Sequence, residues 1–223
     1  MSKERLLILD GHSLMYRAFY ALPALTNSDG IYTNAVYGFT SMLLKMKEEF
    51  EPDYIVTTFD RKAPTFRHEE YKDYKAGRKK MPDELQGQFA LVRELLEKMA
   101  IDIFELDGFE ADDLIGTLSV FAEKQGLEVF IITGDRDALQ LATDNVKIVI
   151  NKKGMSEKEI YDRNRIITDF GVTPTEFIDV KGLMGDASDN IPGVPGIGEK
   201  TAYKLIKEYK SIENLLMNID KVS

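Results

Sequence analysis

Short apolar runs alternate with longer amphipathic stretches over the first two thirds of the chain. The apolar runs predict five strands, over Arg5–Asp10, Asp53–Phe59, Asp102–Leu106, Glu128–Thr133 and Val146–Ile150. Apolar residues at helical spacing predict helices between them, over His12–Leu22, Ala35–Phe50, Asp83–Ala100, a stretch from Glu110 to Gly126, and a short Leu139–Ala142. This alternation predicts an α/β fold with a parallel, doubly wound sheet.

From about Glu157 onward the pattern is helical throughout. We expect helices over Ile166–Phe170, Glu176–Met184, Thr201–Tyr209 and Ile212–Met217. The sequence therefore predicts a sheet-containing core over residues 1–155 and a smaller helical subdomain over 156–223. We expect that subdomain to be truncated at its C-terminus.

Composition restricts the kind of metal site that the chain can build. The 223 residues are 43% hydrophobic and 10% aromatic, which is typical of a globular fold, and they include no cysteine and two histidines. A metal site must then consist mainly of oxygen ligands, which favours Mg²⁺ or Mn²⁺ over Zn²⁺. The apolar run Leu6–Leu9 is too short for a signal peptide or membrane span, so we expect a cytoplasmic protein.

Acidic residues follow four of the predicted strands. They are Asp10, then Asp60, then Glu110 with Asp112 and Asp113, then Asp135 with Asp137. Ligands bind at the carboxyl ends of strands in open α/β sheets. One such aspartate is more often a helix cap or a turn former than a ligand, but four strand ends in succession are hard to explain as caps.

Two further acids, Asp186 and Asp189, are three residues apart and would point the same way on a helical turn. Nine clustered carboxylates require cations, and two hard divalent ions would satisfy them. We expect Asp10, Asp60, Glu110 and Asp112 at one ion, with Asp113 shared or acting through water. The other ion would then take Asp135, Asp137, Asp186 and Asp189.

This arrangement suits hydrolysis of a phosphodiester by a metal-activated water, with Asp10, Asp112 and Asp135 at the reaction. The sequence contains no Gly-x-Ser-x-Gly motif, no Walker-type Gly-Lys-Ser/Thr motif and no plausible histidine-centred triad.

A basic, aromatic segment, residues 61–82, follows Asp60. Residues 61–80 contain eight basic and three acidic residues, a net charge of +5 in a chain whose net charge is −9. Rings and cations interleave as single-stranded nucleic acid requires, although such a run is about as often a solvated charged face. Lys72, Lys75 and Lys79 have helical spacing, and we expect Lys75 and Arg78 to contact the scissile phosphate. Tyr16 is a candidate for base stacking or, equally, for core packing.

Glycines and prolines predict a tight turn just before the helix at residue 201. Gly193, Gly196 and Gly198 lie in this turn, and Lys200 and Thr201 follow it. Free N–H groups at a helix N-terminus bind phosphate, so residues 193–202 are a candidate DNA-binding turn.

These motifs together resemble the 5′-nuclease (flap endonuclease) family, and most closely the N-terminal 5′→3′ exonuclease domains of bacterial DNA polymerase I. The resemblance runs from near the N-terminus to about residue 205. The matching strings are Leu9–His12 with Tyr16-Arg17, Ala35–Phe39, Phe59-Asp60 with Thr65–Arg67, Tyr74–Arg78, Gly108–Asp113, Thr133–Asp137 and Gly182–Ala202.

The resemblance implies Mg²⁺-dependent removal of 5′ flaps and RNA primers in replication and repair. It implies a helical arch containing Tyr74–Arg78, and a helix–hairpin–helix turn that often binds K⁺. The residues on DNA would be Tyr16, Arg17, Arg67, Lys72, Tyr74, Lys75, Arg78, Gly193, Gly196, Gly198, Lys200 and Thr201. It also implies a monomer that acts on flaps, nicks or ends, with a polymerase domain following in a longer native chain.

Two alternatives belong to other classes. A stand-alone PIN-like ribonuclease has the same acids but usually lacks the turn and the basic segment. A non-catalytic module would bind branched DNA without cutting it. Cleavage by the wild-type chain separates the second alternative from a nuclease.

Overall fold

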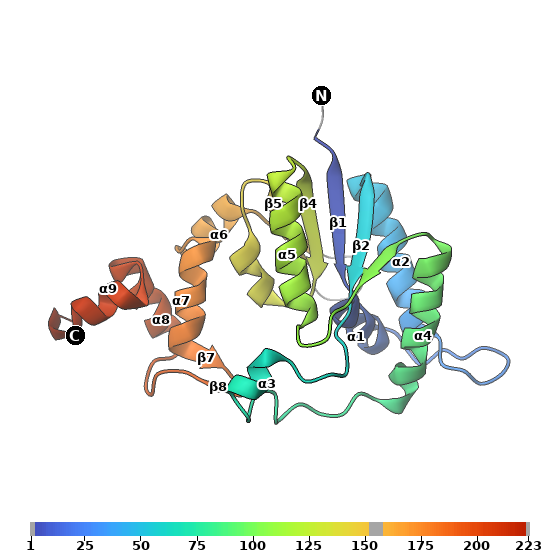
Figure 1. Cartoon of the computed structure of the whole chain (residues 1–223), viewed down its shortest axis with the longest axis horizontal. Coiled ribbons are helices and arrows are strands. Elements are labelled where there is room, and N and C mark those ends of the chain that lie inside the picture. The colour runs from blue at the N-terminus through green and yellow to red at the C-terminus, as the bar shows by residue number, and fades with distance from the viewer. Residues whose placement is uncertain (1–2, 152–157, 222–223) are drawn as a thin grey trace.

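Six strands form one sheet at the centre of the molecule. The computed structural model describes residues 3–151 and 158–221. The strand order is β3-β2-β1-β4-β5-β6. Figure 1 labels the four central strands β2, β1, β4 and β5, which lie side by side. The strands are β1 (Arg5–Asp10), β2 (Tyr54–Thr58), β3 (Asp102–Phe104), β4 (Glu128–Thr133), β5 (Val146–Asn151) and β6 (Lys158–Tyr161).

Strands β1 to β5 are parallel, as predicted, whereas β6 pairs with β5 in the antiparallel direction. The expectation that the chain is all helical from residue 157 is therefore wrong for 158–161. Strand β6 has only four residues, so its alternation of side chains between the two faces of the sheet is too short to predict a strand. Tyr161 packs into the core on one face of the sheet, and Ile160 packs on the other. The expected domain boundary between residues 155 and 156 lies outside the described residues.

The alternation of side chains along β1 produces two separate cores. Leu7 and Leu9 pack against α1 (Gly11–Ala21), α2 (Asn34–Phe50) and α4 (Asp83–Lys98). Leu6 and Ile8 face the opposite side, where α5 (Ala111–Lys124) and the 3₁₀ helix η1 (Arg136–Leu141) lie. Helices cover both faces, so the strands are buried and only their ends are open for function.

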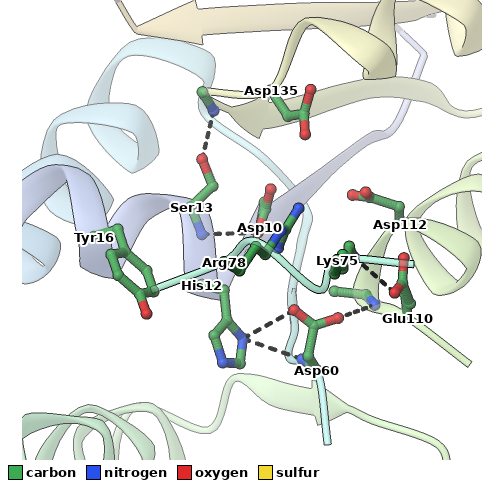
Figure 2. Close-up of a pocket in the computed structure, with 12 residues that line it drawn as sticks. Asp10, His12, Ser13, Tyr16, Asp60, Lys75, Arg78, Glu110, Asp112 and Asp135 are labelled. Carbon is green, nitrogen blue, oxygen red and sulfur yellow. Dashed lines mark hydrogen bonds and ion pairs between the residues drawn. The ribbon is translucent and has the colours of Figure 1, made fainter. Parts of the chain in front are cut away.

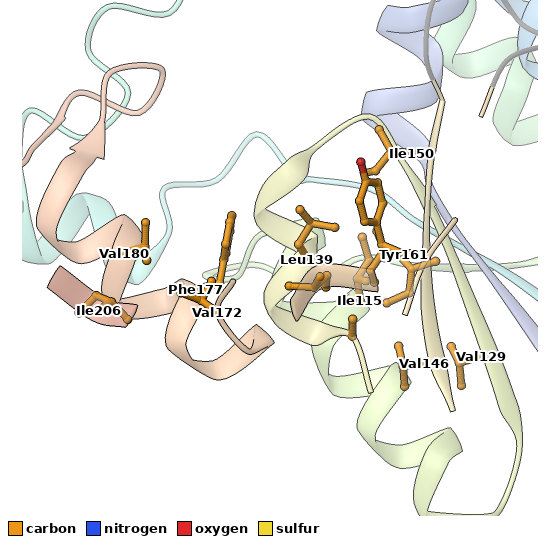
Figure 3. Packing of buried hydrophobic residues seen from close by; sticks show 14 of the residues in the cluster. Ile115, Val129, Leu139, Val146, Ile150, Tyr161, Val172, Phe177, Val180 and Ile206 are labelled. Carbon is orange, nitrogen blue, oxygen red and sulfur yellow. The ribbon is translucent and has the colours of Figure 1, made fainter. Parts of the chain in front are cut away.

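The helical subdomain shares the second core. Its helices are α6 (Arg163–Phe170), α7 (Pro174–Met184), α8 (Glu199–Tyr209), α9 (Ile212–Met217) and the 3₁₀ helix η2 (Ile219–Lys221). The four predicted helices are confirmed. Phe177, Val180 and Ile206 belong to the same buried cluster as Ile115 and Leu139 of the core (Figure 3). The subdomain is thus packed against the sheet-covering layer rather than tethered to it.

A two-stranded hairpin of β7 (Gly185–Asp186) and β8 (Ile191–Pro192) connects α7 to α8. Gly185 has φ +73°, and a Cβ there would meet the Gly193 N at 2.3 Å, so only glycine fits this close approach. The helical turn expected for Asp186 and Asp189 is wrong, because α7 ends at Met184 and Asp186 already lies in strand β7.

The basic segment contains one short helix, α3 (Phe66–Glu70), and no helix over residues 71–82. The expected helical arch at Tyr74–Arg78, with its face of Lys72, Lys75 and Lys79, is therefore wrong. The segment has few apolar residues with which to bury a helix face. Its path is fixed instead by hydrogen bonds to the hairpin: Lys75 N donates to Asp189 O (2.9 Å), and Asn190 Nδ2 donates to Asp73 O (2.8 Å).

No helix within residues 3–151 or 158–221 combines the length and apolar character needed to cross a membrane.

Candidate active site

A cavity of about 470 Å³ opens at the carboxyl ends of the central strands (Figure 2). Five of the nine predicted carboxylates line it: Asp10, Asp60, Glu110, Asp112 and Asp135. Lys75 and Arg78 reach the same cavity from the basic segment, and Tyr16 reaches it from α1. The two predicted phosphate-binding cations therefore face the central acids across one space, although their segment is not helical.

Asp10 is held at the end of β1 by hydrogen bonds from two neighbours. It caps α1 by accepting from Ser13 N (3.0 Å), and it accepts from Thr133 Oγ1 of the adjacent strand (2.7 Å). The Asp10 residue is buried, and its pKa is raised to about 6, mainly by burial and further by Asp60 and Asp135. Its position therefore follows directly from the pairing of β1 with β4.

Asp112 lies in the first turn of α5 and points toward the cavity (Figure 2). Its pKa is raised to about 8, first by burial and then by the charges of Asp10, Asp135 and Asp60. Burial together with repulsion from these three carboxylates disfavours the charged form of Asp112, and a shared cation would relieve both effects.

Asp60 and Asp135 are fixed through backbone contacts. Asp60 Oδ1 accepts from Ala111 N at the start of α5 (2.7 Å), and Asp135 caps η1 by accepting from Asp137 N (2.8 Å). His12 lies beside Asp60, where His12 Nδ1 accepts from the Asp60 N–H (3.1 Å). These contacts orient both acids without neutralising them.

Lysine and arginine side chains pair with the remaining acids. Glu110 accepts from Lys75 Nζ (2.7 Å), and Asp113 forms a two-pronged pair with Arg67 (2.8 Å for each bond). Asp189 accepts from Arg78 (2.5 Å). The Arg67 hydrogen bonds hold the pKa of Asp113 below its usual range, although burial opposes the shift. Asp113 is therefore stabilised as an anion by the protein itself, and Glu110 and Asp189 each have a cationic side chain of the protein as a partner.

Lys181 at the end of α7 joins the last two acids. Its Nζ lies 2.9 Å from Asp137 Oδ1 and 2.8 Å from Asp186 Oδ2. Burial raises the pKa of Asp186, but hydrogen bonds from Lys181 and Ser188 outweigh it and lower the pKa. Asp113, Asp137, Asp186 and Asp189 are not among the residues that line the cavity.

Some predicted residues lie at or beyond the edge of the site. Tyr74 is buried, and its hydroxyl is 3.0 Å from both Glu110 Oε2 and Asp189 Oδ2. Lys72 is exposed, and neither Lys72 nor Arg17 lines the cavity. The turn residues Gly193, Gly196 and Gly198 lead into α8, whose first turn contains the exposed Lys200 and Thr201.

Four residues that the sequence reasoning missed contribute to the site: His12, Ser13, Thr133 and Lys181. Ser13 Oγ also accepts from Gly134 N (2.7 Å), which ties α1 to the end of β4. His12 and Ser13 directly follow Asp10 in the sequence, and this position could have indicated that they lie at the site. The last-turn position of Lys181, five residues before Asp186, was another such signal.

As their side chains are placed, no three acidic or histidine residues of the described chain stand close enough together to hold one ion. The donors nevertheless fit hard divalent cations by chemistry, because they are carboxylate oxygens of like charge that repel one another around one polar cavity.

Comparison with known proteins identifies the family. Residues 5–171 match the 5′-3′ exonuclease N-terminal resolvase-like domain, and residues 172–223 match the 5′-3′ exonuclease C-terminal SAM fold. The chain belongs to the 5′-3′ exonuclease family. It is accordingly a nuclease, that is, a phosphodiesterase, and the resemblance inferred from its motifs is confirmed.

Its curated relatives include DNA polymerase I of Bacillus subtilis, which is 51% identical over 221 residues, or 99% of this chain. DNA polymerase I of Mycobacterium tuberculosis is 46% identical over 223 residues, also 99% of this chain. In both cases the matched region is 25% of the relative, so the chain spans about a quarter of the length of these relatives.

Solved structures share the fold. T5 5′-exonuclease with bound divalent metal ions (zinc) matches with a TM-score of 0.76 and 25% identity, covering 97% of this chain and 79% of that one. Flap endonuclease-1 from Methanococcus jannaschii matches with a TM-score of 0.62 and 21% identity, covering 98% of this chain and 76% of that one. The second likeness concerns the fold alone.

Proposed function

We propose that this chain cuts DNA 5′ flaps and 5′ ends, and removes RNA primers, by two-metal phosphodiester hydrolysis in replication and repair. The observation that carries the proposal is the single cavity in which Asp10, Asp112 and Asp135 face Lys75 and Arg78. Carboxylates that repel one another are suited to bind cations, and two protein cations opposite them are suited to bind a phosphate.

Mg²⁺ is the proposed ion, and Mn²⁺ is expected to replace it. We propose that Asp10, Asp112 and Asp135 hold the ion nearest the cavity, with Asp60, Glu110 and Asp113 in support. Asp135 is moved here from the group expected from the sequence, because it lines the same cavity as Asp10 and Asp112. Asp137, Asp186 and Asp189 would serve a second position. When bound, such ions activate water and offset the charge that develops on the phosphate.

The protein's own groups act on the substrate around these ions. Lys75 and Arg78 extend over the cavity and would bind the scissile phosphate. Ser13 and Thr133 keep Asp10 oriented. Tyr16, at the cavity wall, would stack on the base next to the cut. Each of these roles needs no movement of the sheet.

Duplex DNA is proposed to bind beside the cavity, along the turn at 193–198 and the N-terminus of α8. The first N–H groups of that helix have no acceptor within the helix, and Lys200 and Thr201 add polar contacts. K⁺ at this turn is part of the proposal. Arg17 and Lys72 would contact phosphates, while Arg67 and Tyr74 would mainly shape the site through Asp113, Glu110 and Asp189.

The wider setting rests on the relatives. We propose a cytoplasmic, monomeric unit joined to a polymerase domain in a longer native chain, because similar sequences form a quarter of DNA polymerase I.

The deciding experiment is cleavage of a 5′-labelled flap duplex in Mg²⁺ and in excess chelator, with Asp112→Ala alongside. We expect metal-dependent cutting near the flap junction that Asp112→Ala abolishes. Flap binding by the wild type without any cutting would instead support the non-catalytic branched-DNA module. Cutting only of RNA would support the PIN-like ribonuclease.

A further inference from the structure

Lys181 occupies a place where the proposed function calls for a metal ion. Its ammonium group lies between the carboxylates of Asp137 and Asp186, within 3 Å of an oxygen of each (2.9 and 2.8 Å). The lysine side chain is 25% exposed, so the pair of contacts is partly shielded from solvent. This is the geometry of a bridging cation rather than of a solvated surface lysine.

The two carboxylates come from separate parts of the fold. Asp137 lies in the first turn of η1, directly after β4, whereas Asp186 lies on β7 beyond α7. Asp186 is also fixed by Ser188, which donates from its N–H (2.7 Å) and its hydroxyl (2.6 Å). The acids are therefore held near each other by the backbone, and Lys181 offsets their repulsion.

The acids at the centre of the cavity differ from this pair. Among the described residues, no lysine or arginine forms an ion pair with Asp10, Asp112 or Asp135, whereas Asp137 and Asp186 share one. The carboxylate set thus has one position without a protein cation and one position with a cation already in place.

We propose that Lys181 is a positioning residue that weakens and tunes divalent-ion binding at Asp137 and Asp186. The proposal rests on the two-metal function above. An ion that approaches these oxygens must share them with an ammonium group or displace it, and both carry a cost because like charges repel strongly at short range. The long lysine stem lets the ammonium swing aside without moving α7.

The consequence is a split between the two ion positions in the DNA-free protein. The cavity position binds first and tightly, and the position beside Lys181 fills at higher ion concentration. Bound DNA would then favour the second ion by adding phosphate charge.

The test is Mn²⁺ binding to the full chain without DNA. Binding is measured by the electron paramagnetic resonance signal of free Mn²⁺ and by calorimetry. Three variants accompany the wild type: Lys181→Met, Lys181→Arg and Lys98→Met. Lys98 is an exposed residue at the end of α4, so Lys98→Met removes the same charge away from the acids. Lys181→Gln serves as a second neutral variant should the methionine variant fold poorly.

We expect Lys181→Met and Lys181→Gln to strengthen the weaker class of Mn²⁺ sites about tenfold, which is about 1.4 kcal/mol. The tighter class should be unchanged, and Lys181→Arg and Lys98→Met should behave as the wild type. A weaker class that is unchanged or weakened in the neutral variants overturns the proposal, since a merely structural lysine would give that result.

The outcome is separable from that of the proposed function. If the wild type cuts flaps and binds two classes of Mn²⁺ while the neutral variants leave the weaker class unchanged, the role of Lys181 is wrong and the nuclease function stands. A wild type that binds no Mn²⁺ and cuts no flap overturns both the role of Lys181 and the proposed nuclease function. A lower Mg²⁺ concentration for half-maximal flap cleavage in Lys181→Met would support the role of Lys181 by a second route.

Discussion

The ammonium group of Lys75 donates a 2.7 Å hydrogen bond to Glu110 Oε1, which links the basic segment to the N-terminus of α5. Lys75 has a positive φ of 58°, an uncommon conformation for a residue other than glycine. The basic segment therefore turns at the point where its cation enters the acidic cavity. This contact places Lys75 beside the carboxylates before any substrate binds.

Replacing Lys75 by alanine should slow cleavage far more than it weakens binding. Lys75 faces the reacting phosphate in the proposed site, and loss of one such electrostatic contact typically costs about 10²–10³ in rate. Single-turnover cleavage of a flap duplex in saturating Mg²⁺ measures this effect. Lys62→Ala, at an exposed position of the same segment outside the cavity lining, is the matched control and should keep its rate. Equal slowing in both variants would mean that the segment acts only through its overall charge.

Removing the Tyr74 hydroxyl should loosen the attachment of the basic segment. The buried hydroxyl contacts Glu110 and Asp189, which belong to separate elements. Tyr74→Phe removes the donor from these carboxylate oxygens, which should lower the free energy of unfolding by about 1–3 kcal/mol. Each kcal/mol corresponds to a fall of about 2–4 °C in Tm for a chain of this size. Thermal unfolding in chelator measures it, with the exposed Tyr71→Phe as control. A Tm for Tyr74→Phe equal to that of the control would show that the hydroxyl contacts add no stability.

Asp112 should make the metal-free protein less stable as pH rises. Its pKa is raised to about 8 in the folded chain, mainly by burial, from an ordinary value of 3.8. For an acid with a raised pKa, the neutral form favours folding. That stability is present below about pH 4 and is lost as pH rises through about 8. Asp112→Asn should therefore raise Tm in chelator by more at pH 8 than at pH 5.

Thermal unfolding at the two pH values, with and without Mg²⁺, tests this prediction. The exposed Asp102→Asn variant is the control and should show no such pH-dependent gain. Mg²⁺ should stabilise the wild type at pH 8 and should stabilise Asp112→Asn less. A gain for Asp112→Asn that is the same at both pH values would contradict the assigned cause.

Two glycine-to-alanine changes should have opposite effects on stability. At Gly185 the backbone has φ +73° and a Cβ would meet the Gly193 N at 2.3 Å, so alanine should cost about 2 kcal/mol or more. Gly87 lies in the middle of α4 and a Cβ there meets nothing within 4 Å, so alanine should add about 0.5–1 kcal/mol. Chemical denaturation of both variants measures the change in the free energy of unfolding. A Gly185→Ala variant as stable as the wild type would show that the hairpin can shift to make room for a Cβ.

The sequence predicted the parts of the site whose position follows from the strands. Asp10 and Asp135 lie at the ends of neighbouring parallel strands. The carboxyl ends of parallel strands lie at one edge of the sheet, so an alternating α/β pattern is enough to predict that these residues are close together. The apolar periodicity was strong enough to locate the helices that cover both faces.

The parts that were missed depend on contacts between distant segments. The basic segment has a helical spacing of lysines, yet its path is set by the hairpin through Asp189 and Asn190, more than 100 residues away. Lys181 reads as an ordinary helix-end lysine until Asp137 is brought beside it. Strand β6 is too short for its alternation to stand out. In each case tertiary contacts outweigh a weak local preference.

The pairing register between β1 and β4 sets the distance between the acidic residues at the ends of these two strands. Leu9 is paired with Ile132, so Asp10 and the residues after Thr133 start from adjacent strands at the usual separation of about 4.8 Å. That separation is a property of backbone hydrogen bonding and is independent of side chains. Surface changes in the basic segment or in α8 can therefore alter which substrates are accepted while the spacing of the central acids stays the same.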